Sequence, residues 1–353
     1  MSGRNRSTAI TAASTLPTVP DPDISTLAAV LDPEELGKQL RGLPLSQRWE
    51  ALQDVQIKVL RRHSAKRCTF EIVLRTGLVG KVYAKDRQDV YQAMQGISEA
   101  GFGSEAEFSI PEPVAYLPSL RLLLQERVEG MPARLIFRFG DEPQRAAAAE
   151  RCARWLARFH ALAPLSGPVL NVEEILRRSE RKRDLVSKEG GALAAKSERL
   201  FERLRAAAAA LGTIPLCAGH GDYCSNQVIL AERRTVVVDW DICNIADPSH
   251  DVARFIIGLE RQGLKELGSI GALDGAAEVF LKTYLASGGG PQVAAHLPFY
   301  KAVCYLRGVT WDVKKKGFQW RERAEAMLDE GLRTLQQPYH GRRANVRTAP
   351  QLR

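Results

Sequence analysis

The sequence contains no run of about 18 to 20 apolar residues, which is the length that a helix needs to span a bilayer. We therefore expect no transmembrane helix. The first residues carry early arginines but no continuous apolar stretch, so a secretory signal is not predicted and a cytoplasmic location is expected. The six cysteines form no C-x-x-C pair and have no dense spacing, which argues against a disulfide framework and indicates reduced thiols.

Glycine-rich phosphate loops are missing as well. The segment G-L-V-G-K, which ends at Lys81, lacks the G-x-x-x-x-G-K-[ST] spacing of a Walker A loop, and no G-x-G-x-x-G occurs in the sequence. The glycine run at 288–290 has no strand before it and is predicted to connect two helices. Any phosphate contact would then have to come from basic side chains and from the turn at 63–67.

Basic residues outnumber acidic ones in this chain of 353 residues. It has 50 Lys and Arg against 41 Asp and Glu, which gives a formal net charge of +9. Such a balance suits anionic partners such as a nucleotide or a nucleic acid. Aromatic residues are not interleaved with the arginines of the C-terminal tail, so a stacking platform for single strands is not indicated. Nucleic-acid binding is therefore the weaker alternative, no membrane partner is expected, and the oligomeric state stays open.

The N-terminal part of the sequence alternates strand patterns with turns. Residues 1–25 are rich in Ser, Thr, Ala and Pro and are predicted to be disordered, and residues 26–130 form the first predicted lobe. Its strand-like runs are Val55–Leu60, Cys68–Leu74, Leu78–Tyr83, a piece near Pro113, and Arg121–Val128. One helical segment, Asp89–Ala100, ends at Gly101. Five strands with one helix after the third predict a small α+β lobe.

The rest of the sequence is predominantly helical by pattern. Residues 131–337 form the second predicted lobe, and its charged, Ala-rich stretch 172–211 is predicted to be helical. A single hairpin, made of Gln227–Leu230 and Thr235–Val238, interrupts the helices. Residues 338–353 are predicted to be a flexible basic tail. The predicted fold class is α+β, with an antiparallel β-rich N-lobe and a mostly helical C-lobe.

Polar residues cluster at the ends of the two hairpin strands. The segment G-H-G-D-Y-C-S-N-Q precedes the first strand, and the second strand ends in V-V-D-W-D. The carboxylates of Asp222 and Asp239 thus come from neighbouring strand ends, with the Gln227 amide between them in sequence. Phosphoryl transfer uses such a set, because one carboxylate orients the acceptor hydroxyl while the other, with an amide oxygen, holds Mg²⁺ on the phosphates.

Three blocks of sequence, in order, carry a resemblance to a known family. They are His220-Gly221-Asp222, Val238-Asp239-Trp240-Asp241 and Ala246-Asp247-Pro248-Ser249-His250-Asp251. At these residues the chain resembles the aminoglycoside phosphotransferase and choline kinase-like family, whose catalytic loop runs H-G-D-x-x-x-x-N. The resemblance implies a two-lobed protein-kinase-like fold and the transfer of the γ-phosphoryl group of ATP, with Mg²⁺, to a hydroxyl of a small molecule.

The same resemblance implies roles for individual residues. Asp222 would be the catalytic base or the group that orients the acceptor, and Asp239 would bind Mg²⁺. His220 would brace the loop, and Asp251 would anchor the helix that follows.

Two of the implied assignments leave an alternative. The family places its second metal-binding amide five residues after the catalytic aspartate, where this sequence has Gln227, and Asn226 is the alternative. The resemblance also implies a phosphate-contacting lysine on the third strand, which is Lys81, with Lys85 as the alternative. The acidic partner of that lysine would be Glu99 or Asp89.

Other interpretations of the same residues remain. A pseudokinase that binds a nucleotide or a partner without transfer is the main alternative, because glutamine stands where the family has asparagine and the glycine loop is missing. A zinc site is a second one, since Cys217, His220, Cys224 and Cys243 offer three thiols and an imidazole, although their spacing is imperfect. The acceptor and the choice between ATP and GTP stay open. Carboxylates of the C-lobe helices that would favour a cationic acceptor are Glu173, Glu174, Asp312, Glu322 and Glu325.

Overall fold

The computed structural model describes residues 21–41, 43, 55–73, 77–213 and 215–336. The predicted tail and most of the predicted disordered N-terminal segment lie outside these residues. Contacts between residues group the chain into two units, residues 1–88 with 114–127 and residues 89–113 with 128–353. The lobe boundaries predicted at residues 130 and 337 stay a prediction. None of the helices in the described part of the chain combines the length and the apolar character needed to cross a membrane.

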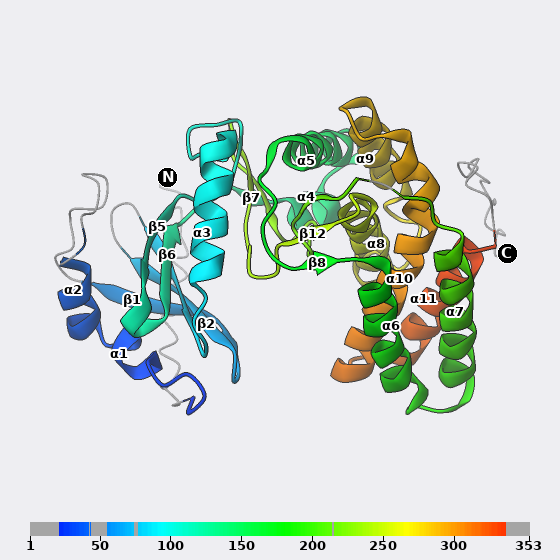
Figure 1. Ribbon diagram of the computed structural model, residues 1–353, viewed down its shortest axis with the longest axis horizontal. Coiled ribbons are helices and arrows are strands. Elements are labelled where there is room, and N and C mark those ends of the chain that lie inside the picture. The colour runs from blue at the N-terminus through cyan, green and yellow to red at the C-terminus, as the bar shows by residue number, and fades with distance from the viewer. Residues whose placement is uncertain (1–20, 42, 44–54, 74–76, 214, 337–353) are drawn as a thin grey trace, which may run out of the picture. The chain divides into compact units, whose positions relative to one another are not determined.

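The first unit is built around a five-stranded sheet with the strand order β1-β2-β3-β6-β5 (Figure 1). The pairs β1–β2, β2–β3 and β3–β6 are antiparallel. The strands are β1 (Gln56–His63), β2 (Arg67–Val73), β3 (Leu78–Tyr83), β5 (Pro113–Leu117) and β6 (Leu122–Glu126). The strands predicted from the sequence are thus confirmed, with small shifts at their ends.

Alternating side chains of this sheet form the core of the first unit. Phe70, Val82 and Leu124 are fully buried there, together with residues of α1 (Leu27–Leu31) and α2 (Pro33–Arg41). Gly80 pairs with Phe70 across β2 and β3, and a Cβ atom on Gly80 would lie 2.3 Å from the Phe70 ring. The second glycine of G-L-V-G-K therefore makes room for an aromatic ring.

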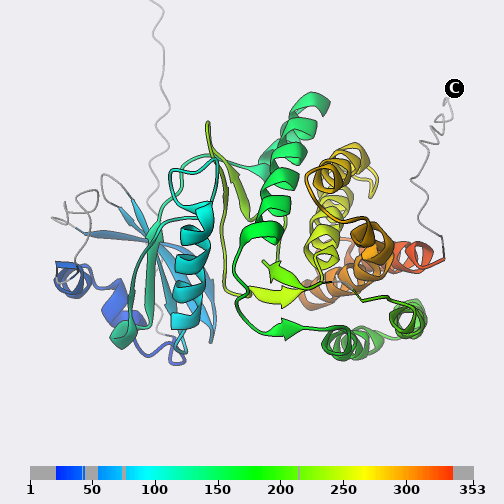
Figure 2. The ribbon, with the colours of Figure 1, turned by 45° about the horizontal axis from the view of Figure 1, so that its top comes forward.

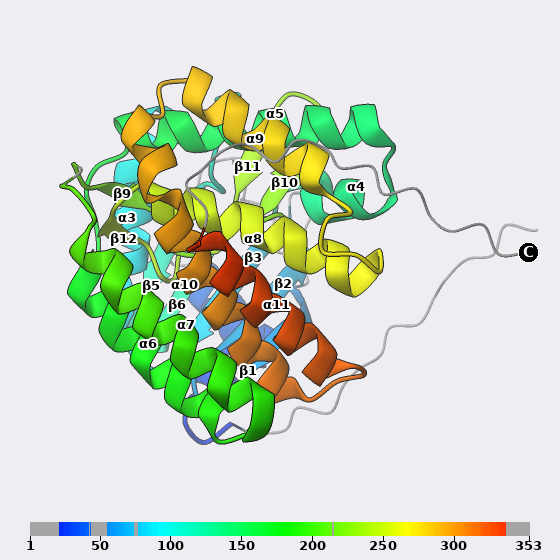
Figure 3. The same cartoon turned by 90° about the vertical axis from the view of Figure 1, so that its right-hand side faces the viewer.

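The second unit is mostly helical, as predicted for the C-terminal part of the chain. Helix α10 packs against α6, α7, α8 and α11 (Figure 3), and α5 lies along α9 (Figure 2). The helices are α3 (Gln88–Ile97), α4 (Ala133–Phe139), α5 (Glu142–Leu162), α6 (Val172–Ser187), α7 (Gly191–Ala209), α8 (Ser249–Glu266), α9 (Asp274–Ala286), α10 (Pro291–Lys315) and α11 (Trp320–Thr334). The predicted helical stretch 172–211 is two helices, because Gly190 and Gly191, with φ of 69° and 55°, turn the chain between them.

Two small sheets lie in the second unit, where the sequence predicted one hairpin. One has the order β4-β11-β10-β7 and the other β8-β12-β9. The predicted hairpin is β10 (Val228–Leu230) paired antiparallel with β11 (Thr235–Val237). The other strands are β4 (Phe108–Ser109), β7 (Met131–Pro132), β8 (Val169–Leu170), β9 (Cys217–Gly219) and β12 (Asn244–Ala246). The prediction of a single hairpin was wrong because strands of two or three residues are too short to show an alternating pattern.

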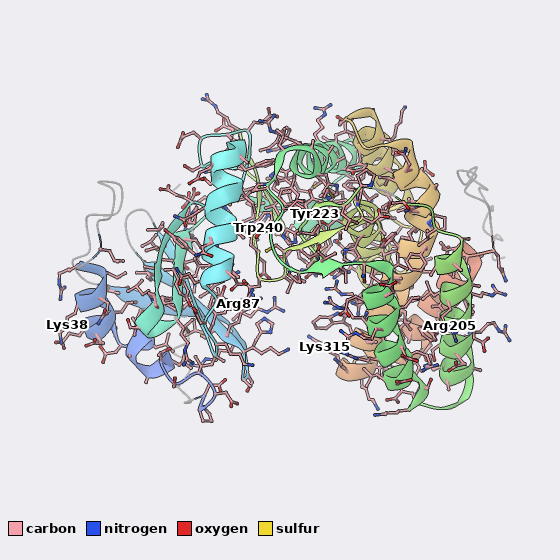
Figure 4. All side chains as sticks on the ribbon, in the orientation of Figure 1. Lys38, Arg87, Arg205, Tyr223, Trp240 and Lys315 are labelled. Carbon is pink, nitrogen blue, oxygen red and sulfur yellow. The ribbon has the colours of Figure 1, made fainter. Side chains whose placement is uncertain are left out.

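Buried aromatic side chains hold the chain where it enters the hairpin and where it leaves it. Trp155 of α5 stacks on Tyr223, with 5.7 Å between ring centroids, and lies 6.0 Å from Trp240. Tyr223 and Trp240 are labelled in Figure 4. The Tyr223 hydroxyl donates to the carbonyl of Cys152 at 2.7 Å. Tyr223 directly follows Asp222, and Trp240 directly follows Asp239. One aromatic cluster therefore holds the backbone on which both candidate carboxylates lie.

Candidate functional site

The loop at residues 220–222 lies between β9 and β10, and glycine is required at its centre. Gly221 has a φ of 78°, in the left-handed region that glycine adopts at no steric cost. A Cβ atom at this position would also stand 2.4 Å from the carbonyl oxygen of Ile242. The glycine of the H-G-D motif is therefore needed both for its backbone conformation and for the close approach of the 242 carbonyl.

Asp251, in the first turn of α8, holds this loop. Its carboxylate accepts hydrogen bonds from the backbone N–H groups of His220 at 2.6 Å and Gly221 at 2.9 Å, and the residue is 1% exposed. Burial alone would raise the pKa of Asp251, but the imidazoles of His160 and His250 hold that pKa well below its ordinary value. Asp251 is thus a buried carboxylate whose hydrogen bonds set the position of the loop backbone.

The ring of His220 connects the loop to the end of β11. Its Nδ1 accepts the backbone N–H of Asp222 at 3.2 Å, and its Nε2 donates to the carbonyl of Val238 at 3.1 Å. The ring therefore has a defined tautomer, with the proton on Nε2. The bracing role that the resemblance implied for His220 thus corresponds to a direct tie between Asp222 and the residue before Asp239.

These contacts do not suit the zinc interpretation. Both ring nitrogens of His220 are occupied by backbone groups, so the imidazole is not available as a ligand. Across the described ranges, no group of three or more His, Cys, Asp or Glu side chains is placed to hold a metal ion. Cys224 is 6% exposed, and burial raises the pKa of its thiol, as expected for a packed cysteine.

The carboxylate of Asp222 contacts two guanidinium groups. Arg254 lies 2.7 Å from Oδ1 through Nη2, and Arg307 lies 2.8 Å from the same oxygen. Arg307 also donates to the carbonyl of Gly221 at 3.2 Å. Burial alone would raise the pKa of Asp222, but the two guanidinium groups outweigh it and lower that pKa. Asp222 is therefore ionised at neutral pH and is a weak proton acceptor.

Gln227 and Asp239 lie side by side at the open end of the hairpin. Nε2 of Gln227 is 3.5 Å from Oδ2 of Asp239, and the backbone N–H of Val238 donates to the Gln227 carbonyl at 2.9 Å. Asp239 has a φ of 72°, a conformation that aspartate tolerates better than most residues. Asn226 is exposed, whereas Gln227 is half-buried beside Asp239. The geometry favours Gln227 over Asn226 as the partner of Asp239, and the metal-binding role of the pair stays a prediction.

Lys81, the predicted phosphate lysine, lies in β3 of the first unit. It pairs with Thr69 of β2 and Leu123 of β6 and is 6% exposed. Lys85 lies beyond the end of the strand and is exposed. Because burying a lysine in a sheet costs free energy unless the charge is compensated, a function is better supported at Lys81 than at Lys85. Its contact with phosphate stays a prediction.

His250 makes the stability of the second unit depend on pH. Its ring is 7% exposed, and burial, reinforced by the cations of Arg307 and Arg254, lowers the pKa of His250 to about 4 against the opposing effect of Asp251. The unfolded chain, with a histidine pKa near 6.5, takes up a proton that the folded chain does not. Stability is therefore lost as the pH falls from about 6.5 to about 4, by on the order of 3 kcal/mol from this group.

We accordingly expect His250→Leu to remove most of this acid-side decline. Urea unfolding of the wild type and the variant at pH about 7.5 and about 4.5 measures it as the difference between the two free energies of unfolding. Between pH about 7.5 and about 8.5 the free energies of unfolding should change in parallel, because the group is neutral in both states there. Equal losses at low pH in the two proteins would show that His250 is not the source.

The sequence did not single out Arg254 and Arg307 as site residues. Arg254 lies three residues after Asp251, on the same side of α8, so the motif that ends at Asp251 could have directed attention to it. Arg307 lies on α10 and reaches Asp222 from 85 residues along the chain. No local pattern marks such a residue, because its role depends on how α10 packs.

Known proteins are similar to this chain in sequence pattern and in structure. Residues 49–295, more than half of the chain, match the model of the phosphotransferase enzyme family. A putative aminoglycoside phosphotransferase from Ralstonia eutropha JMP134 has 17% identity and a TM-score of 0.59, over 86% of this chain and 98% of the other. Choline kinase from Streptococcus pneumoniae has 15% identity and a TM-score of 0.55, over 85% and 99%.

A third similar structure is the ternary complex of the aminoglycoside phosphotransferase APH(2″)-IIa with streptomycin and ATP. It has 15% identity and a TM-score of 0.53, over 86% of this chain and 98% of the other. None of the curated protein sequences matches the chain. The solved structures confirm the predicted protein-kinase-like α+β fold.

Proposed function

Because the chain belongs to the phosphotransferase enzyme family, we propose that it transfers the γ-phosphoryl group of ATP to a hydroxyl of a small molecule. One observation carries the proposal. His220 ties the loop of Asp222 to the strand end where Asp239 meets Gln227, at 3.5 Å. A carboxylate beside an amide suits a metal ion on the phosphates, while a separate carboxylate suits the acceptor. Asp222, Asp239 and Gln227 all belong to the second unit, so this part of the proposal rests on contacts within that unit.

In the proposed reaction, the acceptor oxygen bonds to the γ-phosphorus as the bond to the β–γ bridging oxygen breaks, and ADP leaves. The acceptor hydroxyl donates its hydrogen bond to the Asp222 carboxylate, which fixes the attacking oxygen in line. Because the pKa of Asp222 is lowered, the residue acts first as an orienting group. It receives the proton once the new P–O bond has formed, and releases it to solvent.

The residues at the end of β11 fit a magnesium ion. Asp239 offers a carboxylate oxygen, and a half-turn of the Gln227 amide directs its oxygen to the same place as the nitrogen that now lies 3.5 Å from Asp239. Magnesium is usually held by one or two such protein ligands together with phosphate oxygens. When bound, the ion would neutralise charge on the β- and γ-phosphates. Asp239 and Gln227 would then align the phosphates that they hold through the ion, by contacts within the second unit. The contact of Lys81 with phosphate stays a separate prediction for the first unit.

ATP as the phosphoryl donor is supported by a similar structure that contains ATP. The structure of APH(2″)-IIa is a ternary complex with streptomycin and ATP. The likeness of fold supports ATP as the donor for this chain, while the acceptor does not follow from it.

A nucleotide-binding module without transfer is the second candidate, and one contact favours it. The turn at 63–67 was expected to cover the phosphates with backbone N–H groups, but the N–H of Ala65 donates to the carboxylate of Asp21 at 3.1 Å. This donor is therefore engaged within the protein. Such a module would bind ATP and form no ADP with any acceptor.

ATP turnover with Mg²⁺ and a panel of hydroxyl compounds separates these two candidates. We expect the wild type to form ADP and a phosphorylated acceptor, and Mg²⁺ to tighten ATP binding in calorimetry. Asp239→Ala should abolish turnover and remove the effect of Mg²⁺ on ATP affinity, because it deletes the proposed metal ligand. Glu232→Ala, which changes an exposed carboxylate at the turn of the same hairpin, serves as the control. If Mg²⁺ still tightened ATP binding in Asp239→Ala, the metal assignment would be wrong.

A further inference from the structure

The charged groups that contact Asp222 are positive. Arg254 of α8 and Arg307 of α10 both reach its Oδ1, and their side chains are 13% and 22% exposed. One carboxylate oxygen thus serves two guanidinium groups. The side chain of Asp222 itself is 25% exposed, so solutes reach it. Positive charge is therefore in excess beside the group that is proposed to orient the acceptor.

Lys182 lies on α6, which packs against the helix that carries Arg307. The charged groups that act on Lys182 are Arg307 of α10 together with Arg178 and Glu174 of its own helix. Burial, and then Arg307, lower the pKa of Lys182 to about 8, so the lysine is mostly protonated at neutral pH. Gathering like charges costs free energy in the empty protein, and a bound anion would offset that cost.

Three of the five carboxylates that would have favoured a cationic acceptor are engaged elsewhere. Glu174 is bound by Arg178 at 2.6 Å, and Asp312, only 6% exposed, is bound by Arg261 at 3.0 Å. Glu325 is bound by a lysine of α7 at 3.2 Å. None of the contacts of Asp222 comes from these side chains. These three carboxylates are thus paired within the helices, and none of them offsets the positive charge of Arg254 and Arg307 at Asp222.

We propose that Arg254, Arg307 and Lys182 form an anion-binding subsite for the acceptor, and hence that the acceptor is a hydroxyl compound that carries a carboxylate or a phosphate group. This inference rests on the proposed phosphotransfer, because it names the acceptor class of the same site. The acceptor hydroxyl contacts Asp222, and its anionic group contacts the guanidinium groups and the ammonium group. Guanidinium suits carboxylate and phosphate because its fork of donors matches two oxygens at once. A cationic acceptor would meet like charge here.

Binding of four related probes, measured by calorimetry without nucleotide, tests the subsite. Glycerate carries a carboxylate, glycerol phosphate a phosphate, glycerol no charge and choline a positive charge. We expect at least one of the anions to bind more tightly than glycerol and choline, and the tighter anion identifies the group for which the subsite is built. Lys182→Glu should weaken anion binding by about tenfold or more, because it replaces attraction by repulsion. Lys188→Glu makes the same charge change at an exposed lysine just beyond α6 and should leave the affinity unchanged.

Three results would overturn the anionic acceptor. They are anion binding no tighter than that of glycerol or choline, anion binding unchanged in Lys182→Glu, and loss of ATP affinity in that variant, which would assign the cations to the nucleotide. Preferred phosphorylation of choline would keep the phosphotransfer and overturn the acceptor class. If anion binding depended on Lys182 but no ADP formed under any condition, the anion-binding subsite would be supported and the proposed phosphotransfer would be wrong.

Discussion

Asp222→Asn is expected to reduce the rate of phosphoryl transfer by about 10²- to 10⁴-fold and to leave ATP affinity unchanged. The amide keeps an oxygen that Arg254 and Arg307 can contact, so the positions of these side chains are preserved. It loses the negative charge that orients the acceptor hydroxyl and takes up its proton. ADP release measured in a coupled assay, with ATP binding measured by calorimetry, checks the two parts of this expectation.

A matched control for this experiment is Asp184→Asn. Asp184 is a carboxylate on α6 that is 57% exposed and lies 2.8 Å from Arg183. Its loss should leave turnover unchanged. Asp222→Ala is the less specific variant, because it leaves two partly buried guanidinium groups without their carboxylate and should also lower stability. If Asp222→Asn turned over at the wild-type rate, Asp222 would have no catalytic role.

Asp251→Asn is expected to lower the free energy of unfolding by about 3–5 kcal/mol. The carboxylate accepts two backbone N–H groups while it is almost fully buried, and an amide can accept only one of them. Its NH₂ group would face the other N–H, donor against donor, and leave that donor unsatisfied. Urea denaturation followed by tryptophan fluorescence measures the loss, and turnover should fall as well because the loop of Asp222 is no longer held.

Asp329→Asn makes the same chemical change at the surface. Asp329 is 45% exposed and lies 2.9 Å from Lys196 of α7. An exposed ion pair of this kind contributes less than about 1 kcal/mol. The predicted contrast between the two variants is therefore a factor of three or more in the change of free energy. A loss in Asp251→Asn no larger than that in Asp329→Asn would show that the buried hydrogen bonds do not hold the loop.

Much of the fold could be predicted because its main elements are long enough to show a period. The alternation of Cys68, Phe70 and Ile72 in β2 marks the buried face of the first sheet, and all three are fully buried. The strands of the second unit that were missed have two or three residues and pair with segments far away in the chain, as β4 does with β11. These strands form because distant segments of the chain are packed together, so no local sequence pattern predicts them.

The residues of the candidate site also fall into those that the sequence indicated and those that only the packing of the chain reveals. Asp222, Gln227 and Asp239 lie close to one hairpin, whose strand ends bring Gln227 and Asp239 together, as could be expected from the sequence. Arg307 could not be predicted, because it reaches Asp222 through the packing of a helix distant in sequence, and only the position of Arg254 after Asp251 offered a signal for the other arginine. The charge around Asp222 depends on such residues, so it cannot be obtained by counting the carboxylates in the sequence.

Asp251 and Arg254 lie one turn apart on α8 and hold two different parts of the same loop. Asp251 binds the backbone N–H groups of His220 and Gly221, and Arg254 binds the side chain of Asp222. The two amide protons are therefore shielded from hydrogen exchange only while the loop lies on α8. Any opening that exposes them also separates Asp222 from Arg254, so the exchange rate of two backbone amides reports the population in which the carboxylate is out of place.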